Sequence, residues 1–114
     1  MREPSRDKGR LQDIVTAAEY LNEFTKSVSY ENFLTDKLRF FAILKNVEII
    51  GEAAYMLSFD FKKTYDTIPW DSIIKMRHVL VHGYANVLPE ILWNAATIEV
   101  PLLKLKVDEI MKTI

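Results

Sequence analysis

The chain has 114 residues, of which 49% are hydrophobic and 27% charged, and its formal net charge is −1. These values are typical of a single globular domain over residues 1–114 and exclude a disordered chain, while the lack of cysteine excludes disulfides and thiolate metal sites. No apolar run is long enough to span a membrane and the charged N-terminal segment lacks the apolar core of a secretory signal, so we expect a cytoplasmic protein.

The first two predicted elements are a long helix and a short helical turn. Apolar side chains recur at helical spacing over residues 11–24, which predicts an amphipathic helix over about residues 8–27. The segment 27–29 ends this helix. Ser29 is then placed to cap a short turn over residues 30–34.

The next predicted helix runs from about Thr35 to Leu57 and is apolar on more than one side, which is typical of a central, mostly buried helix. Gly51 and the alanines that follow it leave little side chain, so a neighbouring helix can approach closely. Glu48 and Glu52 lie one turn apart near this point. They form either an exposed salt-bridging edge or a support that orients an active-site base on the facing helix.

Prolines mark the remaining elements. Residues 58–68 form a polar connector with room for a short helical turn, and Pro69 then opens a helix that Gly83 ends. Pro89 opens a long last helix, which Pro101 should kink rather than end because the apolar period continues past it. We therefore expect an all-α, up-and-down bundle of four to five helices with a long, kinked C-terminal helix.

The residues that could carry chemistry lie near the end of the predicted helix that Pro69 opens. Arg77 and His82 stand at R-x4-H, and Tyr84 follows at H-x-Y. An arginine fork matches phosphate oxygens, a histidine can move a proton near neutral pH, and a phenol can accept a transferred group. The negative end of the helix dipole favours the imidazolium form of His82, which suits a general acid. Gly83 lets the chain turn before Tyr84, so we expect Tyr84 to be accessible, whereas Tyr20 and Tyr55 are expected in the core.

Each of these residues also has an ordinary structural interpretation. Arg77 fits a surface ion pair, His82 a helix C-cap and Tyr84 an aromatic lid on the core. A metal pair of His78 and His82 is less consistent with the sequence. The stretch between them lacks the glutamate of H-E-x-x-H, and spacing offers no third ligand. We expect no metal site.

This arrangement of Arg77, His82 and Tyr84 resembles the R-x4-6-H-x-Y signature of HEPN ribonucleases, specifically their HepT-like branch. Further segments match that branch in order and spacing, so that the resemblance covers nearly the whole chain: KNVEIIGEAA (45–54), IPW with two isoleucines (68–74), MRHVLVHGY (76–84) and ILW (91–93). The residue after the motif arginine is usually polar and often asparagine in this branch. Here it is His78, which leaves open an accessory role for His78.

The resemblance implies an HEPN-type fold and a metal-independent endoribonuclease whose catalytic residues are Arg77 and His82. It implies the cytoplasmic toxin of a type VII-like toxin–antitoxin pair, working as a homodimer with the two motifs meeting at a cleft. The implied partner is an MntA-type nucleotidyltransferase antitoxin that transfers AMP to Tyr84. Assembly beyond the dimer, the RNA target and the activity of this particular chain stay open.

Two other functions remain open beside the enzyme. The chain could be a non-catalytic docking subunit for a nucleotidyltransferase, which a net charge of −1 favours because proteins that bind RNA through its phosphates are usually basic. It could also be a purely structural helical dimer, although that leaves the grouping of Arg77, His82 and Tyr84 unexplained. Any RNA contact needs a local basic patch, for which the candidates are Arg2, Arg6, Lys8, Arg10, Lys104 and Lys106.

Overall fold

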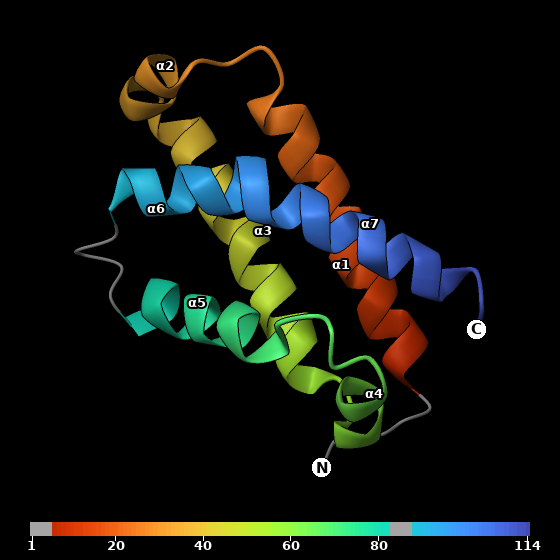
Figure 1. Ribbon diagram of the computed structural model, residues 1–114. Helices are drawn as coiled ribbons and strands as arrows, with labels where there is room; N and C mark the ends of the chain where they lie inside the picture. The colour runs from red at the N-terminus through yellow and green to blue at the C-terminus, as the bar shows by residue number, and fades with distance from the viewer. Residues whose placement is uncertain (1–5, 83–87) are drawn as a thin grey trace.

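The computed structural model describes residues 6–82 and 88–114, with only the backbone at positions 81 and 82 (Figure 1). The elements are α1 (Asp7–Thr25), α2 (Tyr30–Thr35), α3 (Lys37–Met56), α4 (Phe59–Thr64), α5 (Trp70–His82), α6 (Pro89–Asn94), the π-helix η3 (Ala95–Glu99) and α7 (Val100–Met111). The described residues contain no strand, which confirms the all-α prediction. Within those same ranges, no helix is both long and apolar enough to cross a membrane.

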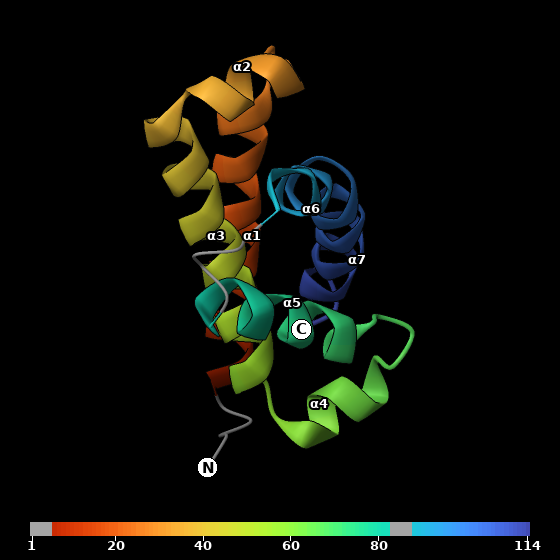
Figure 2. The same cartoon turned by 90° about the vertical axis from the view of Figure 1, so that its left-hand side faces the viewer.

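Helices α1 and α3 lie side by side and form the centre of the bundle. Helix α5 packs on α3, while η3 and α7 pack on α1, all on the same side of the central pair (Figure 2). Every long helix contributes to one core, whose largest fully buried side chains are Phe33, Leu11, Ile14, Leu21, Ile43, Leu57, Leu80, Leu92 and Val107. The core therefore holds α5, which carries the candidate residues, firmly against α3.

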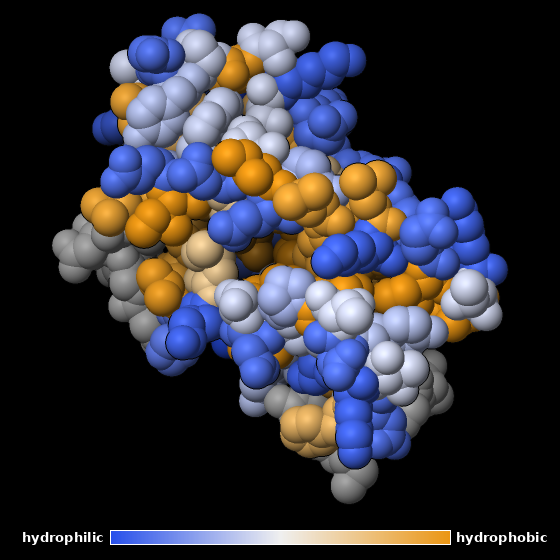
Figure 3. Space-filling view, in the orientation of Figure 1, coloured by the Kyte–Doolittle hydropathy of each residue, from blue (hydrophilic) through white to orange (hydrophobic). Residues whose placement is uncertain are grey.

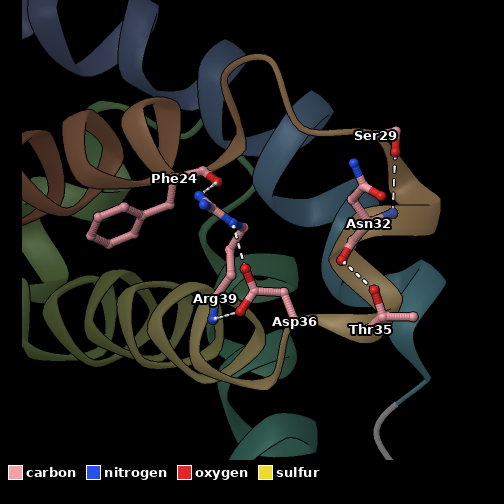
Figure 4. A network of polar contacts seen from close by, with 6 residues as sticks. All are labelled: Phe24, Ser29, Asn32, Thr35, Asp36 and Arg39. Atoms are coloured by element: carbon pink, nitrogen blue, oxygen red, sulfur yellow. Dashed lines mark hydrogen bonds and ion pairs between the residues drawn. The ribbon is translucent and has the colours of Figure 1, made fainter.

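The corner between α1 and α3 is built from local caps (Figure 4). Ser29 caps α2 as predicted, because its hydroxyl accepts a hydrogen bond from the Asn32 backbone at 3.1 Å. Asp36 caps α3 in the same way, by accepting from the Arg39 backbone at 3.1 Å, so α3 begins slightly later than predicted. That backbone hydrogen bond holds the pKa of Asp36 below its usual value. Arg39 also donates to the Phe24 carbonyl at 2.7 Å and ties the corner to α1.

The expected turn within the connector is a complete short helix, α4, capped by Ser58. Ser58 is itself held by a buried carboxylate at the start of α1. Asp7 accepts hydrogen bonds from the Ser58 backbone at 2.9 Å and from its hydroxyl at 2.6 Å. Asp7 and Ser58 are only 8% and 4% exposed. This pair joins the first and fourth helices across 51 positions of sequence.

The C-terminal helix continues across Pro101, as predicted, but its bend has a second cause. The π-helix η3 directly precedes α7, and the Val100 N–H reaches back five residues to the Ala95 carbonyl. A proline has no N–H to donate, and a wider turn before it accommodates the missing bond. Figure 1 shows the ribbon changing direction between α6 and α7.

Candidate active site

The best-defined candidate residue, Arg77, lies where α5 crosses α3. The contact point on α3 is Gly51. A Cβ atom added at Gly51 would overlap the Cβ of Arg77, and it would lie 2.8 Å from the Arg77 Cγ and 3.2 Å from its Cα. The predicted close approach of a neighbouring helix at Gly51 is therefore confirmed, and the approaching residue is the motif arginine.

The guanidinium of Arg77 is held by the next residue of α3. The Arg77 Nη2 lies 2.7 Å from the Glu52 Oε2, and the two side chains are 29% and 51% exposed. The Arg77 Cζ also lies 6.0 Å from the centre of the Tyr55 ring. Arg77 therefore forms an ion pair, as the structural interpretation of its sequence position predicted. It is not on an open surface, however, because its side chain is half-buried between α3 and α5.

A polar groove of about 270 Å³ runs beside this ion pair, between α1, α3 and α5. Its lining residues are Arg10, Asp13, Lys45, Glu48, Ile49, Glu52, Ala53 and Arg77. Cations and carboxylates are equal in number there, so the groove is not the strongly basic track that proteins use for long RNA contacts. Among the basic candidates, Arg10 enters this groove, whereas Lys104 is paired with Asp108 at 2.7 Å, which raises the pKa of Lys104.

The other motif residues are only partly visible. His82 is the last residue of α5, as the sequence predicts, but its side chain and the whole of Tyr84 lie outside the described residues. His78 follows Arg77 on α5 and is exposed. Tyr20 and Tyr55 are 49% and 43% exposed, so the expectation that they are core residues is wrong.

The structure also contains an apolar groove that the sequence analysis did not single out. It has a volume of about 280 Å³, lies between α5 and the η3–α7 segment, and has Val47 and Ile50 of α3 among its lining residues. Ile98, Leu102 and Leu105 are exposed along the same C-terminal segment, and Figure 3 shows hydrophobic surface around a hollow there. The spacing of apolar residues within each helix could not predict this groove, because the groove forms only where α5 and α7 pack near each other in the folded chain.

Comparisons with a family model and with known proteins point to the same family. The family model described as "Ribonuclease HepT-like" matches residues 14–110. A protein of Thermococcus cleftensis named "Probable ribonuclease HepT" is 39% identical over 105 residues, which cover 92% of this chain and 96% of that protein. "Putative RNase MJ1380" of Methanocaldococcus jannaschii is 33% identical over 101 residues, covering 89% of this chain and 93% of that protein.

No solved structure matches the chain. The family match and the alignments to the relatives cover most of the chain. The matched region includes α3 and α5, the two helices between which Arg77 lies. The chain therefore belongs to the HepT-like ribonuclease family.

Proposed function

We propose that this protein is an endoribonuclease and the toxin of a type VII-like toxin–antitoxin pair. The observation that most directly supports the ribonuclease activity is the position of Arg77. Its side chain lies between α3 and α5, its guanidinium is paired with Glu52, and it lines a polar groove. A fixed cation of this kind can stabilise charge that develops on a phosphate, because it needs little rearrangement during the reaction. The family relationship supplies the substrate class, RNA.

In the proposed reaction the ribose 2′-hydroxyl attacks the adjacent phosphorus and the bond to the 5′-oxygen breaks. The products are a 2′,3′-cyclic phosphate and a 5′-hydroxyl, so no water is consumed. The proposed reaction uses no metal ion. Arg77 stabilises the pentacoordinate transition state, which is worth about a hundred- to a thousandfold in rate. His82 transfers a proton, worth about a hundred- to ten-thousandfold.

A homodimer would supply the second proton-transfer group. The reaction needs a base at the 2′-hydroxyl and an acid at the 5′-oxygen, and two copies of His82 brought together provide both. The apolar groove beside α5 supports this proposal, because exposed apolar surface around a hollow is typical of a protein interface. The groove also carries both Glu99 and Lys106, and such opposite charges can pair across a twofold axis.

The proposed partner is an MntA-type nucleotidyltransferase antitoxin that transfers AMP to Tyr84. An AMP group two residues from His82 would add a negative phosphate and a bulky base. The phosphate can occupy Arg77 in place of RNA and neutralise it. Both proteins would act in the cytoplasm, where the RNA is.

Expression of the wild type, Arg77→Ala and His82→Ala in one host, with growth and RNA integrity followed in parallel, tests the function. We expect the wild type to arrest growth and cut RNA, and both variants to be folded and inactive. RNA cleavage by the isolated wild-type protein should continue after EDTA treatment. Restoration of cleavage by Zn²⁺ or Mn²⁺ after chelation would instead assign His78 and His82 as ligands. A folded wild type that cuts no RNA but binds the nucleotidyltransferase would favour the non-catalytic docking subunit.

A further inference from the structure

We infer that Glu52 is a positioning residue for Arg77: its carboxylate fixes the direction in which the guanidinium is presented to the RNA phosphate. The inference rests on the proposed ribonuclease function, and it assigns a role that the R-x4-H motif does not contain. Glu52 belongs to α3, at position 52, whereas the motif begins 25 positions later on α5.

The first argument is geometric. An arginine side chain has several rotatable bonds, and a catalytic contact requires the guanidinium in one place. Three residues of α3 restrict it at different points along its length. Gly51 lies against the Cβ and Cγ, the Glu52 Oε2 is 2.7 Å from Nη2, and the Tyr55 ring lies 6.0 Å from Cζ. Of these, only the contact with Glu52 is an ion pair made by the guanidinium itself, which can hold the planar fork in one orientation.

The second argument concerns what the ion pair contributes to the fold. Glu52 is 51% exposed, and ion pairs at exposed positions add little to the stability of a protein. A glutamate there also reduces the positive charge available for RNA, which would be unfavourable without a function. The guanidinium has five N–H donors, and the pair with Glu52 engages one terminal nitrogen, so the fork can hold Glu52 and phosphate together.

The third argument distinguishes Glu52 from its neighbour Glu48. Both glutamates line the polar groove, and they lie one turn apart on the same side of α3. Within the described part of the chain, however, the ion pair to Arg77 comes from Glu52 and not from Glu48. Glu48 is therefore a matched control, because Glu48→Gln removes the same charge from the same groove without removing the contact to Arg77.

The test compares Glu52→Gln with Glu48→Gln in the purified full-length protein, using a short fluorogenic RNA. We expect Glu52→Gln to lower kcat by about ten- to a hundredfold with a smaller change in KM, since a small displacement of a catalytic group has effects of this size. Glu48→Gln should stay within about threefold of the wild type in kcat. Glu52→Asp, which keeps the charge on a shorter side chain, should recover part of the lost kcat. Both glutamine variants should unfold at nearly the wild-type temperature.

Two further measurements separate positioning from a direct catalytic role or a structural one. In an Arg77→Ala background, Glu52→Gln should cause no further loss of kcat, because Glu52 acts through Arg77. In NMR spectra of the guanidinium groups, the Arg77 signals should show restricted rotation in the wild type and in Glu48→Gln, and free rotation in Glu52→Gln. The NMR measurement shows whether Glu52 restricts the Arg77 guanidinium even if cleavage by the double variant is too slow to measure.

The inference is overturned if Glu52→Gln and Glu48→Gln have equal kcat, or if Glu52→Gln leaves the Arg77 signals unchanged. It is also overturned if Glu52→Gln lowers kcat further without Arg77, which would indicate a direct role in proton transfer. Failure of the proposed function looks different, because Arg77→Ala would then cut RNA as well as the wild type, or no variant would cut it at all.

Discussion

Gly51 and Arg77 are in direct contact where α3 crosses α5, and the contact exists because Gly51 has no side chain. The next residue, Glu52, holds the guanidinium of the same arginine. A single turn of the central helix therefore both admits the arginine and orients it. The position of Arg77 is set by helix packing rather than by a loop.

Replacement of Gly51 by alanine should displace Arg77. An added methyl group would overlap the Arg77 side chain, and overpacking of this kind costs about 1–3 kcal/mol. The better helix propensity of alanine offsets about 1 kcal/mol of that cost. We therefore expect Gly51→Ala to be neutral to about 2 kcal/mol less stable in urea unfolding, and to cut RNA at least tenfold more slowly.

Gly9→Ala is the matched control for this prediction. Gly9 lies in α1, and an added Cβ would have no atom within 4 Å. The gain in helix propensity is then unopposed, so Gly9→Ala should be unchanged or up to about 1 kcal/mol more stable, with wild-type cleavage. Equal cleavage by the two variants would show that the crossing tolerates a side chain.

The buried pair of Asp7 and Ser58 should be a strong determinant of stability. Asp7→Ala leaves the Ser58 backbone and hydroxyl donors buried without their acceptor, which costs about 1–3 kcal/mol. The exposed Asp13 on the same helix is the control, and Asp13→Ala should change the free energy of unfolding by less than about 0.5 kcal/mol. Similar urea midpoints for the two variants would contradict the prediction.

The sequence predicted most of the helices, because helix signals are local. Ser29 caps α2, Pro89 lies in the first turn of α6, and the apolar period continues across Pro101. The hydrogen bonds between Asp7 and Ser58 could not be predicted, since they join residues 51 positions apart and depend on how the helices pack.

The sequence likewise predicted which helix carries the candidate site, but not the contacts that this helix makes with its neighbour. The motif placed Arg77 and His82 on one helix, and α5 indeed contains both. The sequence could not choose between Glu48 and Glu52, which are one turn apart and chemically alike. The choice depends on where α5 crosses α3, and Gly51 was the available signal for that crossing.

Leu102 tests the proposed dimer. It lines the apolar groove and is 59% exposed, so Leu102→Asp should leave the monomer folded while placing a charge in the proposed interface. We expect sedimentation to show a monomer and RNA cleavage to fall at least tenfold. Leu38→Asp is the control, because Leu38 is 88% exposed near the start of α3 and away from the groove. A monomeric wild type that still cuts RNA would contradict the dimer and assign the second proton transfer to His78.

Tyr84 separates a toxin with a modifying antitoxin from a free-standing ribonuclease. Accessibility alone cannot decide which tyrosine is modified, because Tyr20 and Tyr55 are exposed. Selection must come from the motif around Tyr84, which directly follows Gly83 and stands two residues after His82. The AMP groups should therefore map to Tyr84 in peptide mass spectra, with none on Tyr20 or Tyr55.

Tyr84→Phe should keep the fold and much of the toxicity, because the phenol is proposed to receive AMP rather than to act on RNA. It should also escape neutralisation when the cognate nucleotidyltransferase is co-expressed. Intact mass should then show added AMP on the wild type and none on the variant, while His82→Ala, which keeps Tyr84, should still be modified. If the wild type stays unmodified while the partner suppresses toxicity, the partner inhibits by binding alone, and Tyr84 has no part in the inhibition.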